Sequence, residues 1–163
     1  KGRESMTKEE VIALLNCDME KFLRKHSNLR FYALAFDCNA EYANFLVCMN
    51  TTDEFEKTLQ WYQKRYENYN QEENILELRY NPGDWEYTDI SQVDLFSEEE
   101  LAEKYQDDIE KQCEEIMNFC EDIMRDFKKT DVFEKIPKTS DFIAFCIDHD
   151  EDVKEALERQ NII

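Results

Sequence analysis

Two apolar runs joined by a short polar segment constrain the fold of this chain more than any other feature. They lie within residues 30–49, which read RFYALAFDCNAEYANFLVCM. Residues 31–36 are almost wholly apolar, and residues 42–49 are interrupted only by Asn44. The Asp and Asn residues between the runs tolerate the backbone angles of a turn. The pattern predicts two central strands, joined as a hairpin and covered by helices.

Three further segments have the character of strands. Residues 75–80 and 85–90 alternate between apolar and polar side chains, as a half-buried strand does. Pro82 and Gly83 between them suit the two central positions of a type II turn, so we expect a second hairpin here. Residues 142–147 are apolar on both faces, which predicts a fifth strand inside the sheet.

Helical segments lie between these strands. Three of them begin with the spacing of a capping box, in Thr7 with Glu10, Thr51 with Glu54, and Ser97 with Glu100. Residues 97–128 keep apolar side chains three and four positions apart, which predicts one long helical segment with a break near residues 106–108. Because strands and helices do not alternate regularly, we expect an α+β fold, with a mostly antiparallel sheet of about five strands packed against helices.

The length of 163 residues is typical of one domain, which we place at residues 6–163. Residues 1–5 precede Met6 and carry no pattern, and we read them as a remnant of cloning. No signal peptide and no long apolar stretch is visible, so the expected location is the cytoplasm. The six cysteines lack the spacing of a zinc site and are expected to be buried hydrophobic residues.

Charge is the strongest functional signal in the sequence. Asp and Glu number 39 against 20 Lys and Arg, which gives a net charge of -19 and a pI near 4.4. Such a chain repels nucleic acids and anionic lipids and attracts basic proteins. We therefore expect no direct binding of nucleic acid or membrane, and a monomer when the protein is free.

The sequence offers no arrangement typical of an enzyme. It has no glycine-rich phosphate loop, so dinucleotide and P-loop cofactors are not expected. The cysteines lack an evident histidine partner, and the acidic run at residues 148–152 is explained as the start of a helix without a metal. We expect no catalytic residues, no cofactor and no metal, although a hydrolase that uses paired carboxylates remains an alternative.

Several segments resemble a known family. They read FYALA at 31–35, NT at 50–51, LRYNPGDWEY at 78–87 and DFI at 141–143. The chain resembles a family of small bacterial α+β proteins with a domain of unknown function. Some members, and similar acidic proteins, are encoded in polymorphic toxin and contact-dependent inhibition loci and are regarded as immunity proteins. The resemblance implies no catalytic residues, because the family has none agreed.

Charge and resemblance together predict an immunity protein that binds a cognate toxin C-terminal domain, such as a basic nuclease. The acidic outer face of residues 97–128 is the expected surface, and it is otherwise a solvated helix face. The residues assigned to partner binding are Asp107, Asp108, Glu110 and Glu114, with Trp85 and Tyr87 as anchors if they are exposed rather than packed on the sheet. The alternative is an acidic interaction or regulatory module, for instance a DNA mimic.

Overall fold

The computed structural model describes residues 5–163, which form seven α-helices and one four-stranded sheet. The expected cloning remnant at residues 1–5 therefore lies outside the described part of the chain, except for the exposed Ser5. Between residues 5 and 163, no helix is both long and apolar enough to cross a membrane. The α+β class expected from the sequence is confirmed.

The sheet has the strand order β3-β2-β1-β4. Strands β1 (Phe31–Asn39) and β2 (Asn44–Asn50) form the expected hairpin and are the two central strands. Strand β3 (Tyr87–Asp94) pairs antiparallel with β2, and β4 (Lys138–Asp148) pairs parallel with β1. The sheet is therefore mixed, and the prediction of about five mostly antiparallel strands is wrong in strand number and in the direction of β4.

The missing strand is the segment at residues 75–80, which belongs to helix α3 (Glu72–Tyr80). Its alternation of apolar and polar residues also places Ile75 and Leu78 three positions apart, on one side of a helix. Glu72 and Glu73 favour the helix start, and Asn81 before Pro82 ends it. The second hairpin predicted here is therefore wrong.

The turn after α3 also differs from the prediction. Pro82–Asp84 form a short 3-10 helix, in which the side-chain oxygen of Asn81 accepts a hydrogen bond from the Gly83 amide at 3.1 Å. A type II turn would need a positive φ at Gly83, and this glycine does not have one. The turn is therefore stabilised by the Asn81 side chain and does not depend on a backbone conformation that only glycine favours.

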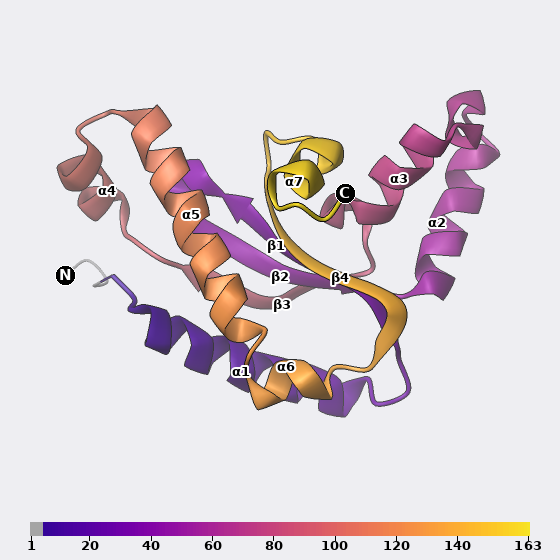
Figure 1. Cartoon of the computed structure of the whole chain (residues 1–163), viewed down its shortest axis with the longest axis horizontal. Coiled ribbons are helices and arrows are strands. Elements are labelled where there is room, and N and C mark those ends of the chain that lie inside the picture. The colour runs from indigo at the N-terminus through magenta and orange to yellow at the C-terminus, as the bar shows by residue number, and fades with distance from the viewer. Residues whose placement is uncertain (1–4) are drawn as a thin grey trace.

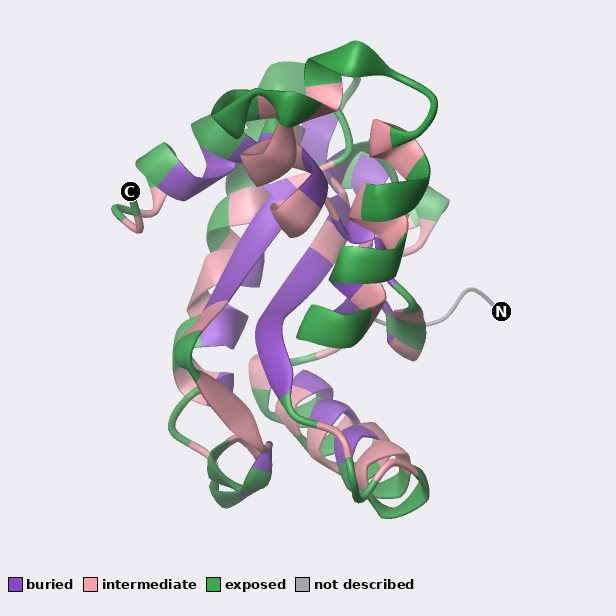
Figure 2. Cartoon of the chain, turned by 90° about the vertical axis from the view of Figure 1, so that its right-hand side faces the viewer, coloured by how far each residue is buried: buried purple, intermediate pink, exposed green. Residues whose placement is uncertain are grey.

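Helices cover both faces of the sheet (Figure 1). One face packs against helices from both halves of the chain, namely α1 (Lys8–Lys25), α4 (Glu98–Tyr105), α5 (Ile109–Phe127) and α6 (Asp131–Lys135). The other face packs against α2 (Thr52–Gln63), α3 and α7 (Val153–Arg159). Figure 2 shows the strands buried between helices whose outer sides are exposed. Strand β4 is therefore apolar on both faces although it lies at an edge of the sheet, which corrects the expectation of an internal strand.

Helix boundaries follow local signals in most places. The capping boxes at Thr7 and Ser97 are both complete, and Thr51 accepts a hydrogen bond from the Glu54 amide. The long helical segment at residues 97–128 is broken as expected, because Gln106 and Asp107 have positive φ angles of 47° and 69°. Helix α2 ends at Gln63, and Thr130 caps α6 in the connection between α5 and β4.

The six cysteines are free, and the expectation that they are buried holds for four of them. Cys38, Cys48, Cys120 and Cys146 are buried, whereas Cys17 is exposed. Burial raises the pKa of the Cys38 thiol well above its ordinary value. Four of the six thiols are therefore small core side chains in the folded protein.

The core between α5 and the sheet depends on Phe36. Its side chain is 0% exposed and stacks on Phe45 with ring centroids 4.4 Å apart. We predict that Phe36→Ala lowers the free energy of unfolding by about 3–5 kcal/mol, because a large core cavity remains. Urea unfolding followed by circular dichroism measures this loss. Tyr66→Ala, at a half-exposed ring, is the control and should change the free energy by less than about 0.5 kcal/mol. Equal losses for the two variants would contradict this account of the core.

Candidate functional site

The four acidic residues assigned to partner binding lie together at one end of the molecule. Asp107 and Asp108 form the turn between α4 and α5, and Glu110 and Glu114 follow in the first turns of α5. All four are exposed. Asp108 also caps α5, because its Oδ1 accepts a hydrogen bond from the Lys111 amide at 3.2 Å. The carboxylates are therefore carried by a helix start that they also stabilise.

A buried glutamine fixes this part of α5 against the sheet. Gln112 is only 6% exposed, and its Nε2 donates hydrogen bonds to the carbonyl oxygens of Ala40 at 3.2 Å and Glu41 at 2.7 Å. The amide of Ala40 in turn donates to Oδ1 of Asp148, at the end of β4, at 3.1 Å. The start of α5, the β1–β2 connection and the end of β4 are therefore held together by hydrogen bonds.

This arrangement creates an acidic groove between α5 and the turn from β4 to α7. The groove has a volume of about 400 Å³, and Cys113 and Met117 line it from α5. Of the described residues that line it, Arg159 is the one cation. Six lining residues carry carboxylates, namely Glu114, Glu121, Asp148, Asp150, Glu151 and Glu155. The sequence analysis assigned Asp148, Asp150 and Glu151 to a helix start and did not predict their proximity to α5.

Arg159 cancels only one of the six negative charges of the groove, through its ion pairs with Glu151 and Glu121. Its guanidinium donates to both carboxylate oxygens of Glu151, at 2.7 and 3.0 Å, and to Glu121. The hydrogen bond with Glu151 is the main reason that the pKa of Arg159 is raised. Of the other carboxylates of the groove, Asp148 accepts hydrogen bonds from the Ala40 and His149 amides, and Asp150 pairs with His149. Glu114 is exposed on α5.

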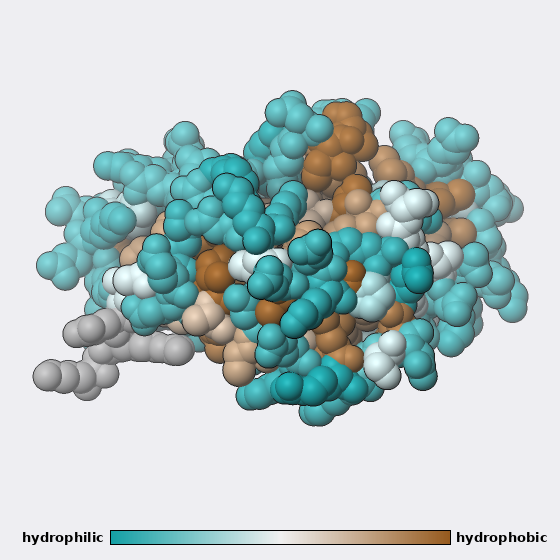
Figure 3. All heavy atoms as spheres, turned by 60° about the horizontal axis from the view of Figure 1, so that its bottom comes forward, coloured by the Kyte–Doolittle hydropathy of each residue, from teal (hydrophilic) through white to brown (hydrophobic). Residues whose placement is uncertain are grey.

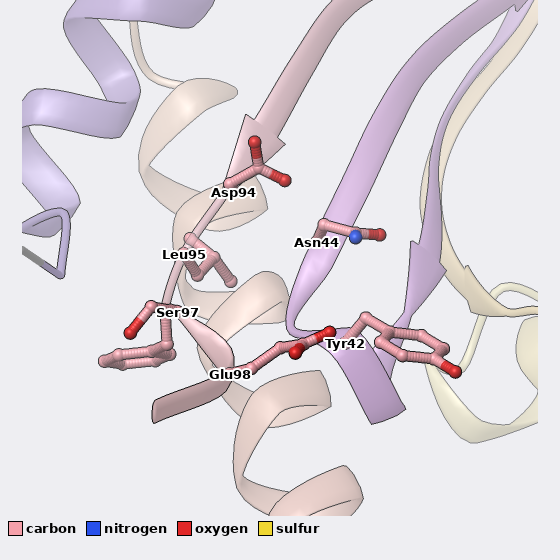
Figure 4. Close-up of a pocket in the computed structure, with 7 residues that line it drawn as sticks. Tyr42, Asn44, Asp94, Leu95, Ser97 and Glu98 are labelled. Carbon is pink, nitrogen blue, oxygen red and sulfur yellow. The ribbon is translucent and has the colours of Figure 1, made fainter. Parts of the chain in front are cut away.

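A second hollow lies on the other side of the β1–β2 connection, where β3 leads into α4. It has a volume of about 340 Å³, and Figure 4 shows the carboxylates of Asp94 and Glu98 at its two ends. Tyr42 lines the same hollow and is 55% exposed. Tyrosine is a frequent anchor at protein interfaces. We call this hollow, the α4–α5 turn and the acidic groove together the acidic surface.

Basic residues gather at the opposite end of the molecule. They lie on the last turns of α1 and α5 and on α6, at Lys21, Arg24, Lys25, Lys128, Lys129 and Lys135. Figure 1 shows α6 and the end of α1 at the bottom of the molecule, whereas the α4–α5 and β4–α7 turns lie at the top. Figure 3, seen from the side of α1 and α6, shows hydrophilic residues over most of that face. The acidic surface and this basic end therefore differ in charge, but residues 52–89, with ten carboxylates against four Lys and Arg, are acidic as well.

Trp85 and Tyr87 lie away from the acidic surface. Tyr87 is the first residue of β3 and Asp94 is the last. At roughly 3.3 Å per residue, these two ends are about 23 Å apart. Trp85 is 6% exposed, so it does not meet the condition of exposure on which its anchoring role depended.

The segment around Trp85 has a structural role that the contacts define. The indole Nε1 of Trp85 and the hydroxyl of Tyr32 both donate to the carbonyl oxygen of Arg79, at 2.9 and 2.6 Å. The guanidinium of Arg79 lies over the Tyr32 ring, 4.5 Å from its centroid. Asn50, also buried, donates to the Tyr32 hydroxyl at 3.1 Å. The segment LRYNPGDWEY at residues 78–87 therefore contributes Arg79 and Trp85 to a polar network beneath α2 and α3.

The acidic surface has the chemistry of electrostatic binding. Clustered carboxylates attract Lys and Arg side chains, and a partly enclosed groove strengthens this attraction relative to open water. No group of three or more His, Cys, Asp or Glu residues within the described range of 5–163 is arranged to hold a metal ion. Positively charged groups are the ligands that these carboxylates attract.

Comparison with known proteins gives one match. Residues 12–163 match the model of a family described as "Domain of unknown function (DUF4303)". No curated protein and no solved structure matches the chain. The matched residues include all four strands and every residue of the acidic surface.

Crowding of carboxylates at the start of α7 should be visible in the pH dependence of stability. A hydrogen bond to Asp152, followed by charge repulsion from it, raises the pKa of Glu155 from its usual 4.5. A carboxyl with a raised folded-state pKa contributes stability at acidic pH, which is lost as the pH rises through that value. We predict that Glu155→Gln raises the melting temperature at pH 7, and that this gain disappears below pH 4.5.

Thermal unfolding at a series of pH values measures this effect. Glu158→Gln is the matched control, because Glu158 lies one turn later on α7 and pairs with Lys154 at 4.0 Å. It should leave the melting temperature at pH 7 unchanged or slightly lower. A Glu155→Gln variant that is less stable at pH 7 would contradict the repulsion described here.

Proposed function

Since the chain belongs to the DUF4303 family, whose domain has no assigned function, we propose its role from its own surface. The protein is an immunity protein, which binds and neutralises a cognate bacterial toxin domain. The toxin domain is a basic nuclease-type effector, and the acidic surface is the binding site. The protein acts by binding and not by catalysis.

The acidic groove is the observation that carries this proposal. Six carboxylates line it, and the single arginine among its described lining residues is already neutralised. A nuclease presents Lys and Arg side chains where it holds phosphate groups, so its substrate surface is complementary to the groove. The negative charge of the acidic surface also speeds association with a basic partner.

The hollow beside the groove supplies an apolar contact to accompany the charges. Tyr42 is exposed there next to Asp94 and Glu98. Aromatic side chains contribute much of the binding energy in protein interfaces, whereas exposed charges mainly set rate and specificity. Tyr42 therefore takes the anchoring role in this proposal, in place of the buried Trp85.

Charge substitution on the acidic surface tests the proposal. The binding partner is the protein encoded next to this one, purified with it and measured by surface plasmon resonance. We predict that combining Asp107→Asn, Asp108→Asn, Glu110→Lys and Glu114→Lys weakens binding by about 10–100-fold, mostly through slower association. Asn is chosen at the first two positions because it tolerates a positive φ and can still cap α5.

A matched control changes the net charge by the same amount elsewhere. It combines Glu56→Lys, Glu67→Lys, Glu73→Gln and Glu86→Gln, which are exposed positions between α2 and the start of β3. Its affinity should stay within about threefold of the original protein. Equal weakening by both sets would indicate a general charge effect, and no complex with the neighbouring protein would refute the proposal. A complex with a DNA-binding protein that is no toxin would favour the alternative, an acidic DNA mimic.

A further inference from the structure

Along strand β4, the backbone N–H and C=O groups of successive residues point alternately toward β1 and away from it. The amide of His149 donates to the carbonyl oxygen of Cys38 on β1 at 2.9 Å. The register between the two parallel strands is regular from Leu34 opposite Ala144 to Cys38 opposite Asp148. Because successive residues of a strand point their backbone groups in opposite directions, Ala144, Cys146 and Asp148 face away from β1.

Side chains of the same protein occupy two of these three outward positions. The amide of Asp148 donates to Oε1 of Glu151 at 3.2 Å. The side-chain amide of Gln160 binds Cys146 in both directions, since it accepts from the Cys146 amide at 2.8 Å and donates to the Cys146 carbonyl at 2.7 Å. The Gln160 side chain therefore takes the place of a neighbouring strand at Cys146.

Ala144 is the outward position without such a partner. Within residues 5–163, neither its N–H nor its C=O has a hydrogen bond on this side. The residue is only 6% exposed, and buried backbone groups are nearly always paired in folded proteins. Ala144 lines a groove of about 300 Å³ between the second half of α5 and the C-terminal residues 159–162. Figure 1 shows the end of β4 running between α5 and α7.

We propose that this groove binds an extended segment of another protein, which pairs with β4 at Ala144 and becomes a fifth strand. Addition of a strand to an open sheet edge uses the backbone for affinity and neighbouring side chains for specificity. Arg125 and Lys128 of α5 line the groove, and Arg125 already pairs with Asp122. The exposed Lys128 therefore favours a segment that carries an acidic side chain.

This site is separate from the acidic surface, and its occupant has the opposite charge. The Arg159–Glu121 ion pair lies between the two, because both residues line both grooves. The inference therefore stands whether or not the protein is an immunity protein. A second copy of the chain is a competing occupant, but the net charge of -19 opposes it.

A synthetic peptide tests the proposal with the protein as it is. The probe is acetyl-Thr-Val-Glu-Val-Glu-Val-Thr-amide, which reads the same in both directions and so needs no assumption about strand polarity. Amide hydrogen exchange, read residue by residue in nuclear magnetic resonance spectra, is the measurement. We predict that saturating peptide slows exchange of the Ala144 amide by at least about tenfold. The Phe145 amide, which already faces β1, should change little.

Two control peptides separate backbone pairing from other binding. Replacing both Glu residues of the probe by Lys keeps its strand character but reverses its charge. Methylating the backbone nitrogens of its Val and Glu residues keeps the side chains but removes the pairing. Neither control should slow the exchange of Ala144. Slowing by the methylated peptide would overturn the proposal.

Variants of the protein extend the test. Lys128→Glu should weaken binding of the acidic peptide several-fold, whereas Lys64→Glu, at an exposed position near the end of α2, should not. Gln160→Ala should free the Cys146 backbone and let the peptide protect that amide as well. The proposal is overturned if Ala144 exchanges as slowly as Phe145 without peptide, if its exchange slows with protein concentration alone, or if the peptide leaves it unchanged.

Discussion

The parallel pairing of β4 with β1 is the constraint on which the rest of the structure depends. It joins segments about a hundred residues apart and places Asp148 opposite Cys38. Asp148 then reaches the amide of Ala40, and Gln112 of α5 binds the carbonyl of the same residue. Without this pairing, the carboxylates of the β4–α7 turn and those of α5 would not share a groove. The acidic surface is therefore a product of tertiary structure and not of any one acidic segment.

The fold tolerates a strong concentration of charge because much of the negative charge has a structural partner. Asp108 and Glu100 accept hydrogen bonds from backbone amides at the N-terminal ends of α5 and α4, where the helix dipole favours a negative charge. Glu151 binds both the Asp148 amide and the guanidinium of Arg159. Crowding remains at the start of α7, where a hydrogen bond with Asp152 and then repulsion from it raise the pKa of Glu155. Surfaces used for binding are commonly those where stability is given up in this way.

Local patterns predicted those features of the fold that local energetics determine. The central hairpin followed from two apolar runs, and the capping boxes located the starts of α1 and α4. The segment at 75–80 was assigned wrongly because its apolar positions suit a strand and a helix equally well. Strand β4 was predicted to be internal because its residues are apolar on both faces. They are apolar because α5 and α7 cover those faces, and this does not depend on whether the edge of the strand is paired.

The candidate site was predictable only in part for the same reason. Composition and helix periodicity located Asp107, Asp108, Glu110 and Glu114, but the residues opposite them come from a turn whose position depends on a long-range strand pairing. Trp85 was selected for its residue type, whereas its indole satisfies a backbone carbonyl inside the protein. Tyr42 was not predicted to be a binding residue, because it lies within an apolar run. An exposed aromatic residue within a strand-like run can be recognised only when the end of the strand is known.

Arg159 links the two surfaces and shows why they need not act independently. Its guanidinium holds Glu121 of α5 and Glu151 of the β4–α7 turn, and also donates to the carbonyl of Cys146 at 3.2 Å. The same side chain therefore sets the width of the acidic groove and helps to close the β4 edge at Cys146. A basic side chain that competed for Glu151 or Glu121 would loosen Arg159 and expose more of that edge. Coupling between the sites would then arise from one shared arginine, without movement of the sheet.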